Sequence, residues 1–138
     1  MIIEEVLKCL YIIKKYEEVN MDKKEALEKV KENGWEIEEM SDELKKDKEI
    51  ASAAIASQPG SIEFVDVSLL DDEELVTNAI IGGENGMLMQ YAGPSLKKNK
   101  EFVMNLLVKT KDNYILEYAD ESLQEDEELK AQAQKNLD

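Results

Sequence analysis

The sequence predicts an all-α fold, a short solenoid-like array of long-helix and short-helix repeats, each about 25 residues long or slightly longer, with one further helix in front. Three observations lead to this prediction. A short apolar and aromatic segment recurs at nearly constant spacing, a capped amphipathic segment follows each copy, and turn residues end each amphipathic segment. Such units cannot bury their apolar faces alone, so we expect them to stack into one continuous core.

The first predicted helix covers residues 2–19. Its apolar stripe has helical spacing, so we expect this face to be buried, with Cys9 as a core thiol: Ile2, Val6, Cys9, Ile13 and Tyr16. Residues 1–21 are therefore predicted to form an N-terminal capping helix, and a second helix is expected to begin near Asp22. A single cysteine excludes an internal disulfide framework and is typical of a reducing compartment.

The recurring segment is interpreted as a short helix. Three copies follow one another at a constant spacing, and a more divergent copy precedes them at a slightly shorter one: Ile62-Glu63-Phe64-Val65, Met89-Gln90-Tyr91-Ala92, Leu116-Glu117-Tyr118-Ala119 and, first in the chain, Ile37-Glu38-Glu39-Met40. A leucine follows each copy, at Leu44, Leu69, Leu96 and Leu123. Because they recur at the repeat spacing, Phe64, Tyr91 and Tyr118 are expected to pack between repeats.

A long helix is predicted after each of those leucines. Asp or Asn at an N-cap accepts the free amide hydrogens of the first turn, and such residues precede every long segment: Asp47, Asp72, Asn99 and Asp126. Leu75, Val76, Ala79 and Ile80 show the i, i+1, i+4, i+5 stripe that buries one helix face. Residues rich in Asn, Gly, Pro and Asp then end each helix.

We interpret residues 1–138 as a single domain. Residues 22–125 are expected to hold four repeats, and residues 126–138 a C-terminal capping helix. In that last helix Gln132 and Gln134 replace large apolar residues of the earlier copies, as a terminal, solvent-facing repeat requires.

The repeats resemble a bacterial family of short helical repeats of unknown function, over roughly residues 22–130. The fourth copy carries the resemblance best, with Asn99-Lys100-Glu101-Phe102-Val103 leading to Leu116-Glu117-Tyr118-Ala119 and Leu123. Glu39 stands where the family has an aromatic residue, Pro59 interrupts a turn, and Asp120 replaces a serine. The resemblance implies the repeat fold and supplies no activity or catalytic residue.

The composition argues against an enzyme. The chain has 32 acidic residues against 17 basic ones, all lysine, and no histidine, for a formal net charge of −15. Without Arg or His there is no bidentate phosphate-binding fork and no imidazole base or metal ligand, so we expect no catalytic residues, no metal and no cofactor. The acidic run at residues 71–74 is explained by helix capping, and the glycine-rich residues 82–86 by a turn.

The charge directs the functional hypothesis toward a protein partner. Residues 49–96 hold eight acidic side chains and no lysine. We therefore expect a non-enzymatic interaction module that binds a basic protein surface, with these contact residues: Trp35, Glu63, Asp66, Asp71, Glu73, Glu74 and Glu84.

An alternative hypothesis is an inhibitor that mimics the charge of a nucleic acid and occupies the binding site of a nuclease or another nucleic-acid-binding protein. Nucleic acid and anionic lipid are themselves polyanions, so neither is expected to bind directly. With no cationic export signal and no long apolar run, a cytoplasmic location is expected. The oligomeric state is left open.

Overall fold

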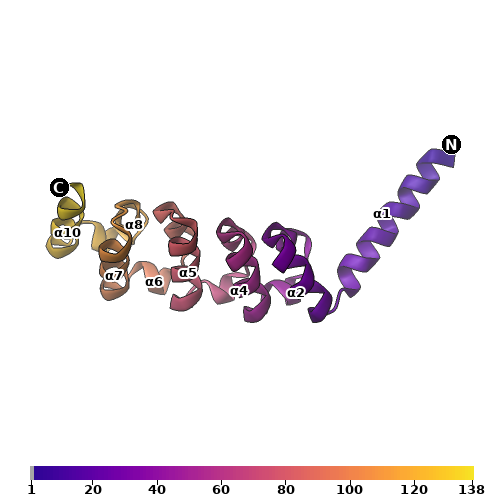
Figure 1. Cartoon of the computed structure of the whole chain (residues 1–138), viewed down its shortest axis with the longest axis horizontal. Coiled ribbons are helices and arrows are strands. Elements are labelled where there is room, and N and C mark those ends of the chain that lie inside the picture. Colours follow the sequence, from indigo (N-terminus) through magenta and orange to yellow (C-terminus); the bar gives the residue numbers. More distant parts are fainter. Residues whose placement is uncertain (1) are drawn as a thin grey trace.

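The chain folds as an all-α array of helical repeats. The computed structural model describes residues 2–138, and the side chains of all of these except residues 17–20. The long helices α2 (Lys23–Glu32), α4 (Lys48–Ser57), α5 (Glu73–Gly83), α7 (Lys100–Thr110) and α10 (Glu127–Leu137) follow one another along the array, and the termini lie at opposite ends (Figure 1). None of the described helices combines the length and apolar character needed to cross a membrane.

Each repeat continues from its long helix into two shorter elements. The first short elements are η1 (Gly34–Glu39), η2 (Pro59–Phe64), η4 (Gly86–Tyr91) and α8 (Tyr114–Glu117). The second are α3 (Asp42–Lys45), η3 (Val67–Leu69), α6 (Pro94–Lys97) and α9 (Glu121–Gln124). The predicted short helix is thus a tight 3-10 turn in three of the four repeats, and an α-helical turn in the fourth.

The predicted stripe of the long helices forms the core. Ile50, Ala51, Ala54 and Ile55 are buried in α4, and the equivalent residues of the next two long helices are buried as well: Leu75, Val76, Ala79, Ile80, Phe102, Val103, Leu106 and Leu107. The short elements close the core, with Ile37, Ile62 and Met89 fully buried. In the fourth repeat Ile115 is buried and Leu116 only half-buried, so the alignment of Leu116 with Met89 is shifted by one residue there.

Consecutive repeats are joined by backbone hydrogen bonds along the connections between repeats. The N–H of Asp66 donates to the carbonyl of Lys45 at 3.2 Å, that of Gly93 to Leu70 at 2.8 Å, and that of Asp120 to Lys97 at 3.0 Å. The three donors hold equivalent positions in successive repeats, so each repeat is fastened to the one before it by the same bond. This regularity explains why these connections keep one length.

Helix α10 is joined to the preceding repeat by polar side chains. The Asn136 side-chain amide donates to the carbonyl of Leu107 at 3.1 Å and to the side-chain oxygen of Asn113 at 3.0 Å. Asn113 in turn donates to the carbonyl of Ala133 at 2.9 Å. Only Leu129 of α10 is fully buried, and Gln134 is exposed, which fits a helix with one face toward solvent.

The N-terminal helix α1 (Ile2–Asn20) corrects one prediction. It extends away from the array (Figure 1), and the side chains of residues 2–16 are all exposed. The expected burial of the stripe from Ile2 to Tyr16 is therefore wrong, and Cys9 is an exposed free thiol rather than a core residue. The helical spacing correctly indicates an apolar face, but no repeat lies against that face, so residues 2–16 do not cover the end of the array.

Candidate interaction surface

The starts of the long helices form one edge of the array, which we call the linker edge because the connections between repeats run along it. At each start an Asp or Asn accepts backbone N–H groups of the first turn, as predicted. Asp72 accepts from Leu75 at 3.0 Å, Asn99 from Phe102 at 3.0 Å, and Asp126 from Leu129 at 3.1 Å. These side chains therefore already accept hydrogen bonds that stabilise the helix ends, and a structural role explains them without a partner.

A ladder of ion pairs joins these helix starts. The first residue of a long helix is a lysine that contacts two carboxylates of the next long helix, the N-cap Asp and the second helical Glu. Lys23 lies 3.0 Å from Asp47 and 2.8 Å from Glu49. Lys48 lies 2.8 Å from Asp72 and 3.4 Å from Glu74, and Lys100 lies 3.0 Å from Asp126 and 2.9 Å from Glu128.

The ladder shifts the pKa of its members. Hydrogen bonds with Glu49, Asp72 and Glu128 raise the pKa of Lys23, Lys48 and Lys100, respectively. Contact with Lys48 and Lys100 lowers the pKa of Asp72 and Asp126, helped by the N-cap bonds. Much of the acidity near the starts of these helices is thus compensated within the molecule.

One junction breaks the ladder. The first residue of α5 is Glu73, at the position that Lys23, Lys48 and Lys100 hold in the other repeats, and the next N-cap is Asn99 in place of Asp. The Asn99 side-chain amide lies 3.5 Å from the Glu73 carboxylate, and Glu101 follows where Glu49, Glu74 and Glu128 receive a lysine. A small hollow of about 170 Å³ lies here, lined by Glu73, Asn99, Glu101, Phe102 and Asn105.

The seven predicted contact residues do not gather on one surface. Glu73 and Glu74 lie at the start of α5 and Glu84 at its end, about 16 Å away for a helix of this length. Asp66 accepts the N–H of Ser68 at 2.9 Å and Asp71 accepts that of Ser95 at 3.1 Å, so both stabilise the short elements. Glu74 belongs to the ladder. Of the seven predicted residues, Glu73 holds the position of a ladder lysine, and among the described residues no lysine forms an ion pair with it.

The remaining two predicted residues lie on the short first elements. Trp35 is 42 % exposed and makes an edge-on contact with Phe64, with ring centroids 6.1 Å apart. Glu63 lies near Tyr91 of the next repeat. Partial burial and this carboxylate raise the pKa of the Tyr91 phenol.

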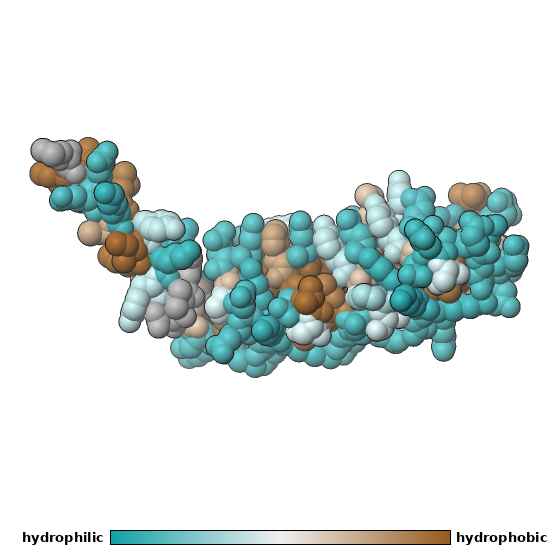
Figure 2. All heavy atoms as spheres, turned by 180° about the vertical axis from the view of Figure 1, so that it is seen from behind, coloured by the Kyte–Doolittle hydropathy of each residue, from teal (hydrophilic) through white to brown (hydrophobic). Residues whose placement is uncertain are grey.

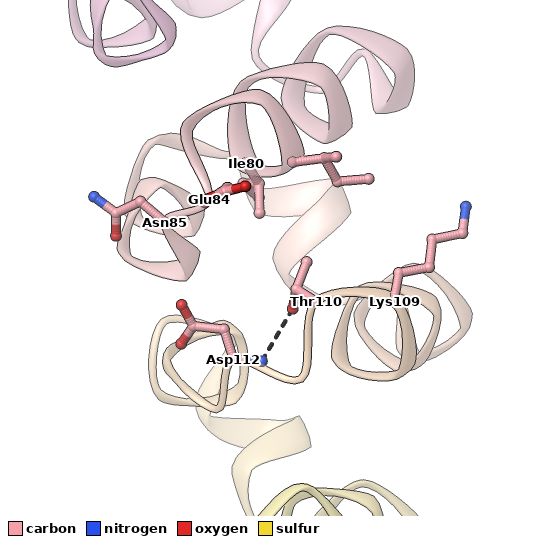
Figure 3. Close-up of a pocket in the computed structure, with 7 residues that line it drawn as sticks. Ile80, Glu84, Asn85, Lys109, Thr110 and Asp112 are labelled. Carbon is pink, nitrogen blue, oxygen red and sulfur yellow. Dashed lines mark hydrogen bonds between the residues drawn. The ribbon is translucent and has the colours of Figure 1, made fainter.

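A larger groove opens at the other edge of the array, where α5 and α7 end (Figure 3). It measures about 630 Å³ and is lined by Ile80, Ile81, Glu84, Asn85, Lys109, Thr110 and Asp112. Its polar groups serve the turns. Asp112 accepts the N–H of Gly86 at 2.8 Å and its own N–H donates to Thr110 Oγ1 at 3.1 Å, and Asn85 accepts the N–H of Met87 at 3.0 Å. The groove therefore combines two isoleucine side chains with polar groups, of which Asp112, Thr110 and Asn85 already hydrogen-bond within the turns.

The sequence contains a signal for the ladder that our sequence-based predictions missed. Asp-Lys occurs at residues 22–23 and 47–48, and Asn-Lys at 99–100, whereas residues 72–73 read Asp-Glu. Comparing those pairs across the repeats would have identified the break. Over the described residues, no three His, Cys, Asp or Glu side chains gather as they would around a metal ion.

The repeats match a known family model twice. A domain of unknown function, DUF4116, matches residues 22–70 and again residues 72–124. Each match spans two repeats, and α1 and α10 lie outside both. No curated protein and no solved structure matches the chain.

Proposed function

Since the chain belongs to the DUF4116 family of domains of unknown function, we propose from its surface that it is a non-enzymatic interaction module that binds a basic protein. The observation that carries this proposal is the break in the ladder. Glu73 and Glu101 stand where three other junctions join carboxylates through a lysine. A lysine or arginine side chain of a partner would supply the missing cation.

The proposed contact is local rather than spread over the whole acidic surface. The carboxylates at the three lysine-bridged junctions already have a cation, so they gain less from a basic partner than Glu73 and Glu101 do. The hollow of about 170 Å³ at this junction is large enough for the end of one basic side chain. Affinity should then depend on Glu73 more than on the net charge.

The test compares two charge reversals on the same helix. The variant Glu73→Lys supplies the missing lysine from within the chain, while the control Glu84→Lys makes the same change of charge at the far end of α5. Synthetic peptides rich in lysine and arginine serve as probes, with binding measured by fluorescence anisotropy at low and physiological salt. We expect E73K to weaken the best-binding peptides about fivefold, which corresponds to the roughly 1 kcal/mol of a favourable exposed ion pair. E84K should change binding much less.

Equal losses for E73K and E84K would contradict a local site and indicate binding through net charge alone. The same measurement addresses the alternative of nucleic-acid mimicry. A mimic needs a continuous row of uncompensated negative charge, and the lysines of the ladder interrupt such a row along this edge. Binding to a basic nucleic-acid-binding protein that duplex DNA displaces, with no loss in E73K, would favour mimicry over the proposed site.

A further inference from the structure

Helix α1 presents a large apolar surface that the array does not cover. Sixteen large hydrophobic side chains are exposed in the described part of the chain, and nine of them lie in α1: Ile2, Ile3, Val6, Leu7, Leu10, Tyr11, Ile12, Ile13 and Tyr16. Figure 2 shows brown, apolar patches among hydrophilic ones along the projecting helix. A solitary helix of this length is only marginally stable in water. A large exposed apolar face of this kind is typical of a surface that binds another molecule.

The spacing of the apolar residues suits a second helix. Ile2, Val6, Cys9, Ile13 and Tyr16 are separated by four, three, four and three residues. That alternation is the heptad pattern of a seam along which one helix packs against another.

We infer that α1 pairs with α1 of a second copy of this chain, in antiparallel orientation, so that the protein is a homodimer. The charge distribution favours a second copy of the chain as the partner of α1. Residues 2–20 carry four acidic residues against three lysines, whereas residues 21–138 carry 28 acidic residues against 14 lysines. Helix α1 is thus the nearly neutral, apolar part of an otherwise strongly acidic chain, and the surface it matches best is its own.

The orientation also follows from charge. A parallel pair would direct two strongly negative arrays the same way and bring them close together, whereas an antiparallel pair directs them to opposite ends. Within the helix, Glu4 and Glu5 lie near the start, and in the second half Lys14 and Lys15 are followed by Glu17 and Glu18; an antiparallel pair centred on Cys9 places position 4 opposite position 14. Antiparallel pairing brings the acidic start of one helix toward the lysines of the other, and it also aligns the two helix dipoles favourably.

The first test measures mass in solution. Light scattering coupled to size-exclusion chromatography of the full chain should give twice the monomer mass of 15.7 kDa. The variant Val6→Glu should return the mass to that of the monomer. The matched control Val67→Glu makes the same change at a residue of the array that is 79 % exposed, and it should remain dimeric. A wild-type chain that stays monomeric across the concentration range would overturn the inference.

The second test determines orientation and does not depend on how α1 tolerates a buried charge. In a Cys9→Ser background, chains carrying Ile2→Cys are mixed with chains carrying Tyr16→Cys, two positions equally far from position 9 on either side. Under mild oxidation an antiparallel pair should form a disulfide only in the mixture. Cross-linking of each chain with itself would overturn the antiparallel arrangement.

A chain that stays monomeric and binds neutral lipid vesicles through α1 would overturn the homodimer and would indicate that α1 binds a lipid surface. The E73K variant should remain dimeric, so this inference and the proposed partner site can fail separately.

Discussion

The residue Asp72 links two repeats through one carboxylate. It accepts the N–H of Leu75 at 3.0 Å as the N-cap of α5, and it lies 2.8 Å from the ammonium of Lys48 in the preceding repeat. The variant Asp72→Ala removes both contacts and leaves a free amide in the first turn. We expect it to lower the free energy of unfolding by about 1 kcal/mol, the usual loss for an N-cap, as measured by urea denaturation.

The variant Asp72→Asn separates the charge from the cap, because asparagine can still accept the Leu75 N–H. The pKa of Asp72 is lowered from 3.8 in the folded protein, chiefly by the hydrogen bond with Lys48. A lowered pKa means that the ionised form favours folding at pH values above 3.8, and that this contribution disappears as the pH falls through the folded-state pKa.

The stability difference between wild type and D72N should therefore be present at neutral pH and vanish in acid, once the pH is below the folded-state pKa of Asp72. Urea unfolding of both proteins across this range measures it. A difference that stays constant with pH would show that the carboxylate charge of Asp72 contributes nothing to the junction.

At the scale of the element, local signals in the sequence predicted the helices well. An Asp or Asn before an apolar stripe identified the start of each long helix, and the buried stripes of α4, α5 and α7 are the predicted ones. Those features are local, because a cap needs only its own first turn. The ladder break at Glu73 depended on comparing neighbouring repeats, and the position of α1 depended on what lies opposite its apolar face, which helical periodicity does not encode.

Helix α10 depends on side-chain hydrogen bonds more than the other long helices do. Leu129 is its one fully buried side chain among the described residues, and Asn136 joins it to the carbonyl of Leu107 and to Asn113. The variant Asn136→Ala removes both bonds, which should cost about 1 to 2 kcal/mol. Because repeats contact mainly their neighbours, the effect should be confined to the C-terminal end.

Hydrogen exchange measured by mass spectrometry tests this directly. The amides of α10 should exchange several-fold faster in N136A, while those of α4 should keep their wild-type rates. The control Gln134→Ala alters an exposed side chain of the same helix and should leave both helices unchanged. Faster exchange throughout the array would contradict local fraying and indicate that the repeats unfold as one unit.

At the scale of the whole molecule, two electrostatic effects oppose each other. The ladder pairs stabilise the array, but their lysine side chains are 41 to 50 % exposed, so solvent screens each pair and its contribution is small. Against them stands the mutual repulsion of a chain with net charge −15. Salt screens both effects, weakening the ladder while relieving the repulsion.

The repulsion should dominate, because it acts among many charges along an extended array whereas the ladder is limited to three junctions. We therefore expect the Tm to rise as sodium chloride increases from about 10 mM to about 150 mM, over which the Debye length falls from roughly 30 Å to 8 Å. Thermal unfolding followed by circular dichroism measures the shift. The double variant Glu73→Lys with Asn99→Asp completes the ladder and reduces the net negative charge, so its Tm should be higher at low salt and rise less with added salt. A wild-type Tm that falls with salt would instead show that the ion pairs of the linker edge outweigh the repulsion.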